Sequence, residues 1–261
     1  MNLKHILTAS SIAVIVAGPV LAENVLRWTS QGDALTLDPH SQNESPTIAM
    51  NGQLYESLVT RDADLNLQPE LAESWSVDAD GWTFNLRKGV KFHDGADFTA
   101  EDVAFSFERA RHEASDYKEQ IKSITEVKVI DAHTIILVTD GPNPILPNQL
   151  TSLYIMDKGW AEANDIVAPQ NFKAQEENFA VRNANGTGPF TLVSRAPDEK
   201  TVMARNANWW GNGKFPGNVD RIEYRPITNA ATRVAALLSG EVDFVLDPPL
   251  QDLKRIEATD G

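Results

Sequence analysis

The chain has 261 residues, of which 42% are hydrophobic and 23% are charged, a composition that suits one or two domains with a real core and excludes a disordered or fibrous protein. Its net charge of −14 speaks against a nucleic-acid partner, because phosphates are neutralised by a basic protein surface. The absence of cysteine excludes disulfides, thiolate metal sites and cysteine nucleophiles.

Residues 1–22 are predicted to form a cleavable secretory signal peptide. Lys4 and His5 give it a short basic start, residues 6–20 are mostly apolar, and Ala22 ends a stretch that suits a signal peptidase. A membrane anchor is the alternative, but the apolar run is shorter than the ~20 residues that a spanning helix needs. We therefore expect cleavage after Ala22 and export of the mature protein to the periplasm.

The first part of the mature chain predicts a strand, a polar loop and a helix. Residues 25–28 favour a strand, and apolar residues at helical spacing favour a helix over residues 47–58. Residues 62–73 place Asp, Asp, Asn and Glu at the ligand positions of a calcium-binding loop. Leu67 stands where such a loop turns sharply and needs glycine, so we expect a hairpin turn instead.

The next segment predicts a strand, a turn and a helix. Residues 81–86 alternate apolar and polar side chains, as a half-buried strand does, and Thr99 is expected to cap a helix that ends near Arg111. Between them, His93 and Asp94 would supply half of a catalytic triad. No G-x-S-x-G motif provides a matching serine, so we interpret the pair as a structural turn.

Strands and helices continue to alternate over the rest of the chain. We expect a β-hairpin over 121–139, a proline-rich loop and the start of a helix over 141–150, a strand end at 155–157, paired strands from 190 and over 200–206, a strand over 221–225, a helix over 228–239 and a strand over 241–246. This order predicts a mixed α/β domain with a second, β-rich layer.

Two motifs in the second half are candidates for binding. Gly186, Thr187 and Gly188 lack the lysine of a phosphate-binding loop and the spacing of a dinucleotide fingerprint, so these glycines indicate either tight backbone turns or close approach to a ligand. Trp209–Trp210 indicates either a stacking platform or a filled core layer behind a turn. The histidines show no metal-binding spacing, and we expect no metal and no cofactor.

Several ordered motifs resemble those of one protein family. They are LAESW at 71–75, GWTFNLRKGVKFHDGADFTAEDVAFSFER at 81–109, NGTGPF at 185–190, NANWWG at 206–211 and RVAALLSGEVDFV at 233–245. In this order and spacing, the chain resembles the bacterial extracellular solute-binding proteins of family 5, the dipeptide, oligopeptide and nickel type. The departures are small, such as Ala96-Asp97-Phe98 where a Pro-Leu-Thr type of sequence is commoner.

The resemblance implies an α/β fold of the periplasmic binding protein type II, in which two lobes close on a ligand. Family members are roughly twice as long as this chain, so the resemblance implies that only the first lobe, with its extra β-rich subdomain, is present. We accordingly expect the signal peptide at 1–22 and lobe I over 23–246, with the inserted subdomain at roughly 55–180. The hinge and the start of a truncated second lobe are expected at 247–261.

The resemblance also points to loops that face the cleft between the lobes. The loop after the first strand is the first choice, because its backbone amides and Gln31 can hydrogen-bond a ligand, although an ordinary polar loop is the alternative. Asp247, at the hinge, is expected either to meet a ligand cation or to cap a turn. The candidate ligand-binding residues are therefore Ser30, Gln31, Gly32, Asp33, Gly186, Thr187, Gly188 and Asp247.

The function that the resemblance implies is non-catalytic. We expect the periplasmic substrate-binding component of an ABC importer, a monomer that captures peptides or peptide-like solutes and delivers them to permease subunits in the inner membrane. Nickel chelates, oligosaccharides or opine-like solutes are alternative ligands for the same fold. A secreted hydrolase is the rival from another class, and the lack of a nucleophile–base motif argues against it.

Overall fold

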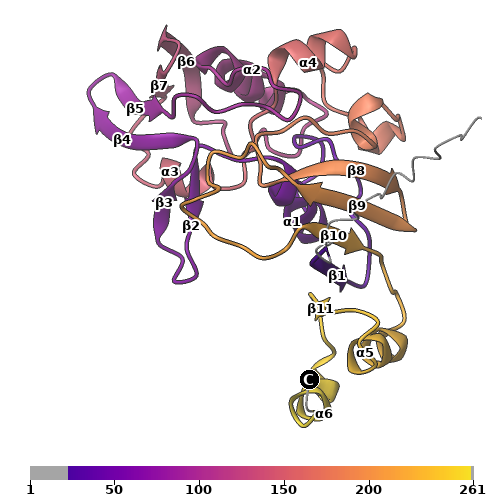
Figure 1. Ribbon diagram of the computed structural model, residues 1–261. Coiled ribbons are helices and arrows are strands. Elements are labelled where there is room, and N and C mark those ends of the chain that lie inside the picture. Colours follow the sequence, from indigo (N-terminus) through magenta and orange to yellow (C-terminus); the bar gives the residue numbers. More distant parts are fainter. Residues whose placement is uncertain (1–22, 260–261) are drawn as a thin grey trace, which may run out of the picture.

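A computed structural model describes residues 23–259, so the predicted signal peptide lies outside the described residues. A five-stranded mixed sheet has the strand order β11-β1-β10-β9-β8 (Figure 1). Helix α1 (Ser45–Leu54) packs on this sheet and shares a buried core with Trp28 and Tyr224. The strands are β1 (Val25–Thr29), β8 (Phe190–Ala196), β9 (Lys200–Arg205), β10 (Arg221–Tyr224) and β11 (Phe244–Val245).

The register of this sheet sorts its strand ends into two rows. Strand β1 is parallel to β10 and β11, and β9 is antiparallel to β10 and β8, so β1, β8, β10 and β11 all run the same way. The loops after β1 and β11 therefore share one edge, which we call the carboxyl edge. The row at that edge contains Trp28, Tyr224, Thr201 and Arg195, and the row at the opposite edge contains Val25, Arg221, Ala204 and Thr191.

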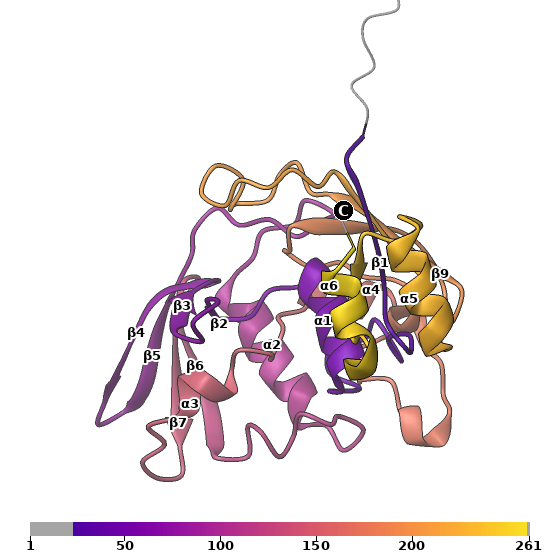
Figure 2. The same cartoon turned by 90° about the horizontal axis from the view of Figure 1, so that it is seen from below.

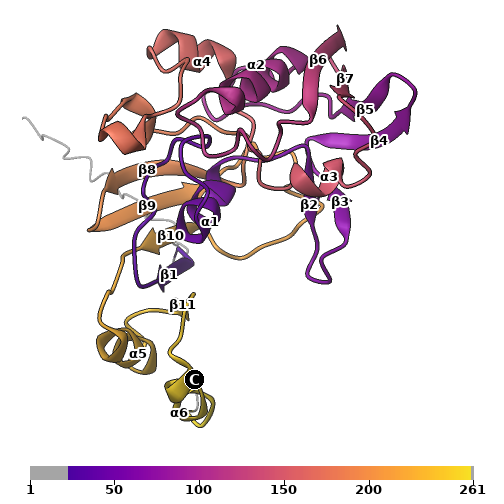
Figure 3. The same ribbon diagram turned by 180° about the vertical axis from the view of Figure 1, so that it is seen from behind.

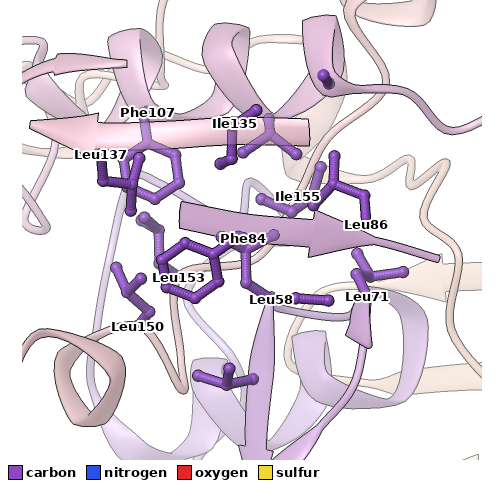
Figure 4. Packing of buried hydrophobic residues seen from close by; sticks show 14 of the residues in the cluster. Leu58, Leu71, Phe84, Leu86, Phe107, Ile135, Leu137, Leu150, Leu153 and Ile155 are labelled. Carbon is purple, nitrogen blue, oxygen red and sulfur yellow. The ribbon is translucent and has the colours of Figure 1, made fainter. Parts of the chain in front are cut away.

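A four-stranded antiparallel sheet, in the order β4-β5-β7-β6, forms the β-rich layer that the sequence predicted. Phe84 and Leu86 of β5 are buried while Asn85 between them is exposed, which confirms the alternating pattern. They pack with Phe107 of α2 (Ala100–Arg111) and Ile135 in one cluster (Figure 4). The strands are β4 (Ala72–Asp78), β5 (Gly81–Leu86), β6 (Ile124–Asp131) and β7 (Thr134–Thr139).

Helix α2 begins where the sequence predicted, after Thr99. The backbone N–H of Thr99 donates to the carboxylate of Asp102 at 2.8 Å, so the first turn is closed by a capping box. Val103, Phe107 and Ala110 are buried on one face of the helix.

The acidic stretch that resembles a calcium loop is a β-hairpin, as expected. Strands β2 (Val59–Arg61) and β3 (Leu67–Pro69) pair antiparallel. The turn between them is closed by Asp62, whose Oδ1 accepts hydrogen bonds from the N–H groups of Asp64 and Asn66. This carboxylate is engaged by its own turn.

Short helices complete the described chain. Within residues 23–259, none of the helices combines the length and apolar character needed to cross a membrane. Figures 1 and 3 show α5 and α6 beyond β11, at the end of the molecule away from the four-stranded sheet, and Figure 2 views them from below. The remaining elements are α3 (Leu146–Gln149), α4 (Lys158–Ala163), α5 (Ala230–Leu238), α6 (Leu253–Glu257) and the 3₁₀ turns η1 (Phe172–Ala174), η2 (Phe179–Val181) and η3 (Leu250–Asp252).

The helix expected over 47–58 is shorter than its apolar pattern. It ends at Leu54, whose carbonyl accepts a hydrogen bond from the Gly188 N–H at 3.0 Å, and Tyr55 continues in an extended conformation. The apolar residues after Leu54 are buried by the extended chain, so their helical spacing was misleading.

Two expected strands also differ. Residues 155–157 form no strand, because the Met156 N–H donates to the Ser106 hydroxyl and Asp157 caps α4. The strand expected over 241–246 is reduced to Phe244–Val245, because the N–H groups of residues 241 and 242 donate to the Ala236 carbonyl at the end of α5.

A closed ion pair joins α2 to the segment that follows β1. Arg109 donates to both carboxylate oxygens of Asp38, at 2.6 and 2.7 Å, and both side chains are fully buried. Burial opposes ionisation of Asp38, but the Arg109 guanidinium outweighs it and lowers the Asp38 pKa to about 2. Burial lowers the pKa of the adjacent His40 to about 4, so this imidazole is neutral and accepts from Arg109.

Candidate functional site

The carboxyl edge collects the loops that follow parallel strands. The chain leaves β1 at Ser30 and β11 at Leu246, and it turns between β8 and β9 at residues 197–199. In open α/β sheets, ligands bind outside the carboxyl ends of the strands. This edge is therefore the candidate site, and the predicted residues Ser30–Asp33 and Asp247 lie on it.

The loop Ser30–Asp33 is held from beneath by hydroxyl groups. The hydroxyls of Ser30 and Tyr224 lie 2.9 Å apart, and both hydrogen-bond the carbonyl of Gly32. Burial raises the pKa of Tyr224 to about 12, so its phenol stays protonated and can donate. Ser30 is buried, whereas Gln31 and Gly32 are exposed, so the loop presents Gln31 to solvent on a fixed base.

Asp33 anchors the same loop through a buried ion pair. Its carboxylate lies 3.2 Å from the Arg195 guanidinium, with the two side chains 4% and 0% exposed. The carboxylate also accepts from the N–H groups of Ala34 and Asp198, both at 2.8 Å. Arg195 in turn donates to Thr201 and to the Ala34 carbonyl. Asp33 therefore fixes the loop to the β8–β9 hairpin.

Asp247 joins the loop from the other side. Both of its carboxylate oxygens lie 3.1 Å from the backbone nitrogen of Gln31, which donates to them. One of them also lies 3.4 Å from Nε of Arg233, on α5. The structure thus brings together the predicted residues Gln31 and Asp247, which are 216 positions apart in the sequence.

A cavity of 620 Å³ opens beside this loop, a size that suits a small organic ligand. Leu35 and Phe172 give its wall an apolar part, and Asp198 and Glu176 give it carboxylates. The full lining consists of Asp33, Ala34, Leu35, Gln170, Phe172, Lys173, Gln175, Glu176, Glu177, Val181, Pro197 and Asp198. The cavity can therefore accept a solute with both apolar and polar groups.

The predicted residues Gly186–Gly188 lie elsewhere. They precede β8, so they lie beyond the edge of the sheet opposite to the carboxyl edge. All three are buried, and a Cβ on Gly186 would stand 2.0 Å from the Leu54 carbonyl oxygen. The structure does not bring this turn into contact with Ser30–Asp33.

His93 packs against that glycine turn. Its Nδ1 accepts from the Gly186 N–H, and its Nε2 lies 3.2 Å from the Gly188 carbonyl, so the ring is neutral with its proton on Nε2. Burial lowers the His93 pKa in keeping with this state. The His93 ring thus contacts backbone groups of the glycine turn, and the Asp94 N–H donates to the Asn185 side chain.

The Trp209–Trp210 pair covers a buried carboxylate. Both indole N–H groups donate to Glu56, at 2.8 and 2.9 Å, and Glu56 is 2% exposed. The Arg87 guanidinium lies 3.8 Å from the centre of the Trp210 ring. Figure 1 shows the loop between β9 and β10 reaching from the five-stranded sheet toward β2. Trp209 and Trp210 therefore form a packed layer behind a turn, as one of the two interpretations predicted, and not a stacking platform for a ligand.

Comparison with known families decides the relationship. Residues 66–261 match the model of "Bacterial extracellular solute-binding proteins, family 5 Middle". The chain belongs to this family. The glutathione-binding protein GsiB of Salmonella choleraesuis (strain SC-B67) is 30% identical over 247 residues, which cover 93% of this chain and 45% of that protein.

Solved structures of family 5 proteins match the same region. The periplasmic binding protein DppA from Helicobacter pylori, in complex with the peptide STSA, superposes with a TM-score of 0.79 at 28% identity, covering 90% of this chain and 49% of that one. AgaA from A. tumefaciens R10, in complex with agropinic acid, gives a TM-score of 0.78 at 25% identity, covering 88% and 45%. The chain thus spans about half the length of the relatives that it matches.

Family 5 membership confirms the predicted fold class, a mixed α/β lobe of the type II periplasmic binding protein fold. The family consists of solute-binding proteins, and two of the relatives, the oligopeptide-binding protein OppA of Escherichia coli and DppA, are named as periplasmic. Within the described residues, no group of three or more His, Cys, Asp or Glu side chains could hold a metal ion.

Three residues at the carboxyl edge were not predicted from the sequence. Arg195 and Tyr224 fix the loop after β1, and Arg233 lies beside Asp247, which accepts from the Gln31 N–H. Each of the three belongs to a different element far away in the sequence. Arg233 is the first residue of the motif RVAALLSGEVDFV, so the motif contained one signal for it. Arg195 and Tyr224 stand in ordinary strand patterns and gave no such signal.

Proposed function

We propose that this chain is the solute-binding component of an ABC importer and that it captures peptides or peptide-like solutes at the carboxyl edge. One observation carries the proposal: the loop after β1 is anchored by the buried Asp33–Arg195 pair and by Tyr224, it exposes Gln31 to solvent, and its Asp33 lines a cavity of 620 Å³. A rigid base under an exposed polar loop lowers the entropic cost of binding.

The family relatives support a peptide-like ligand. GsiB is named for binding glutathione, and DppA was solved with a peptide. We propose that this chain works with permease subunits of the inner membrane after export to the periplasm, in line with its periplasmic relatives. We also propose the domain boundaries given above, with lobe I over residues 23–246 and the hinge from residue 247.

An opine-like solute is the second candidate ligand, because AgaA was solved with agropinic acid and aligns over most of this chain. Agropinic acid and peptides share carboxylate and amide groups, which the same edge can bind. A wall with both Phe172 and acidic groups fits either class.

Thermal unfolding of the purified mature chain tests the proposal, with glutathione, short peptides, agropinic acid and a disaccharide tried in parallel. A solute that binds only the folded state at a hundred times its Kd adds about 2.7 kcal/mol to the free energy of unfolding. We expect peptides to raise the melting temperature most. A rise with agropinic acid alone would establish the second candidate, and a rise with the disaccharide alone or with no solute would overturn the proposal.

A further inference from the structure

The carboxylate of Asp247 bridges two parts of the molecule. It accepts from the Gln31 N–H with both oxygens at 3.1 Å, and it lies 3.4 Å from Nε of Arg233. The Arg233 side chain is 3% exposed, whereas that of Asp247 is 41% exposed. The negative charge therefore stands at the surface, above a buried positive charge and a backbone donor.

Arg233 requires a negative partner at this position. Its Nη1 donates to the carbonyls of Ile227 and Thr228, at 2.6 and 3.2 Å, but its buried Nε has no hydrogen-bond partner among the described residues. A buried guanidinium without a counter-charge costs several kcal/mol. The buried Nε therefore favours a carboxylate beside it, whichever molecule supplies that carboxylate.

A neighbouring aspartate shows what a tighter pair looks like. Asp243 accepts from the Arg27 backbone N–H at 2.8 Å and from its guanidinium at 2.9 and 3.0 Å. All three distances are shorter than those of Asp247, although the Arg27–Asp243 pair is exposed. Asp247 is thus the more loosely held of the two, above the more deeply buried arginine.

We propose that the Gln31 N–H and the Arg233 guanidinium form a carboxylate-binding site, which Asp247 fills internally and which a ligand carboxylate takes over. The identity of that ligand rests on the proposed function, since peptides and opine acids carry carboxylates. The site itself rests only on the geometry at the carboxyl edge.

Exchange of the carboxylate would also loosen the segment that follows β11. Strand β11 pairs with β1 at only two positions, and the Leu246 N–H donates to the Thr29 carbonyl. The Asp247–Gln31 contact comes directly after these bonds. A ligand that displaces the Asp247 carboxylate therefore removes one contact that holds the chain at residue 247, where the hinge is proposed, and leaves the 3.4 Å bond from Arg233 Nη2 to the Asp247 carbonyl.

The first test is chemical rescue of Asp247→Ala with sodium acetate, compared with sodium chloride at equal ionic strength. We expect the variant to melt at a lower temperature than the wild type. Acetate should raise its melting temperature back toward that of the wild type, and chloride should not. In ¹⁵N–¹H spectra, the Gln31 amide signal should shift with acetate. Wild type should need about tenfold more acetate for the same shift, because its tethered carboxylate competes.

Two further variants serve as controls. Asp243→Ala leaves an exposed arginine that water can solvate, so acetate and chloride should affect it equally. Adding Arg233→Met to Asp247→Ala should abolish the acetate response, since the buried charge is gone. Equal effects of acetate and chloride on Asp247→Ala would overturn the site. If that variant does not fold, Asp247→Asn and the acetate titration of the wild-type Gln31 signal decide the question in the same way.

A dipeptide and its C-terminal amide then test the ligand, by the Gln31 shift in wild type. A larger shift with the free acid supports replacement of Asp247 by a ligand carboxylate. Equal shifts overturn that replacement even if acetate rescues the variant. Acetate rescue without any peptide shift would leave the carboxylate site standing and count against the proposed peptide function, so the two failures are distinguishable.

Discussion

The two turns that the sequence singled out for binding have opposite surroundings. Gly186–Gly188 is buried, contacts the backbone at Leu54 and receives the His93 ring. The loop Ser30–Asp33 lies at the far edge of the sheet, with buried groups beneath it and Gln31 exposed above. The first turn joins parts of the lobe to one another, whereas the second has a face that is free for a solute.

This difference shows what glycine contributes at each place. At Gly186 the missing side chain allows two backbone segments to touch, since any Cβ would overlap the Leu54 carbonyl. A Cβ added at Gly32 would have no other atom within 4 Å. Substitutions should therefore separate the two turns: changes in the interior should cost stability, and changes on the outer face of the loop should cost binding.

The largest effect is expected at the anchor under the loop, with Asp33→Ala. The change leaves the fully buried Arg195 guanidinium without its negative partner. It also removes the acceptor of the Ala34 and Asp198 backbone N–H groups. Breaking a buried pair in this way costs about 3–5 kcal/mol. Chemical denaturation should show this loss directly. Asp243→Ala, which breaks an exposed Asp–Arg pair, is the matched control and should cost about 0–1 kcal/mol. Similar losses in both variants would contradict the anchoring role of Asp33.

The next largest effect should come from Gly186→Ala. A methyl group 2.0 Å from the Leu54 oxygen forces backbone to move, and overpacking of this kind costs about 1–3 kcal/mol. The same change at Gly32 should stay within about 0.5 kcal/mol, as is usual for exposed sites. Melting temperatures of the two variants compare the turns directly. The comparison fails if Gly32→Ala is the more destabilising.

A pair of acidic residues lies beside the interior turn. Glu56 is buried under the two indoles, and the half-buried Glu70 accepts from the N–H and hydroxyl of Ser57. Burial raises the pKa of Glu56, and the Glu70 charge raises it further. Burial likewise raises the pKa of Glu70, although the hydrogen bonds from Ser57 and the charge of Arg87 oppose this. The other charges around the pair are Glu73, bonded to Arg87, and Lys214, near the Trp210 ring.

These raised pKa values predict that stability falls as the pH rises. The folded state binds more protons than the unfolded state above the ordinary pKa of glutamate, so the free energy of unfolding declines by at most about 1.4 kcal/mol per pH unit for one proton. The decline runs from the ordinary pKa of glutamate up to the raised pKa of Glu56, about 8. Between about pH 7 and pH 8, above the ordinary titration of histidine, melting temperatures should fall by about 2–4 °C for each kcal/mol lost.

Glu56→Gln keeps an acceptor for the indoles and removes the charge, so it should flatten this slope. Glu73→Gln, a change of an exposed carboxylate in the same neighbourhood, should leave the slope unchanged. If the stability of Glu56→Gln falls with pH as steeply as that of the wild type, another group causes the pH dependence.

Local patterns predicted most of the frame. The alternation at 81–86 and the capping signal at Thr99 each depend on neighbouring residues, and both elements formed as expected. The length of the helix over 47–58 was overestimated, because the N–H of Gly188, from a distant segment, donates to the Leu54 carbonyl, where the helix ends. The candidate site shows the same limit. The family resemblance pointed to Ser30–Asp33, but Arg195 and Tyr224, which support this loop, reach it only through the register of the sheet.

The smallest effect on stability is expected at the outer face of the loop, with Gln31→Ala. The Gln31 side chain is exposed, so its loss should change the free energy of unfolding by less than about 0.5 kcal/mol. If the side chain binds the solute, losing one hydrogen bond of about 0.5–1.5 kcal/mol should weaken the affinity by about two- to tenfold. Calorimetric titration with the solute that gives the largest melting shift measures this, and Lys122→Ala, exposed and distant, is the control. An unchanged Kd would remove the Gln31 side chain from the site, and a loss of stability as large as that of Gly186→Ala would erase the difference between the two turns.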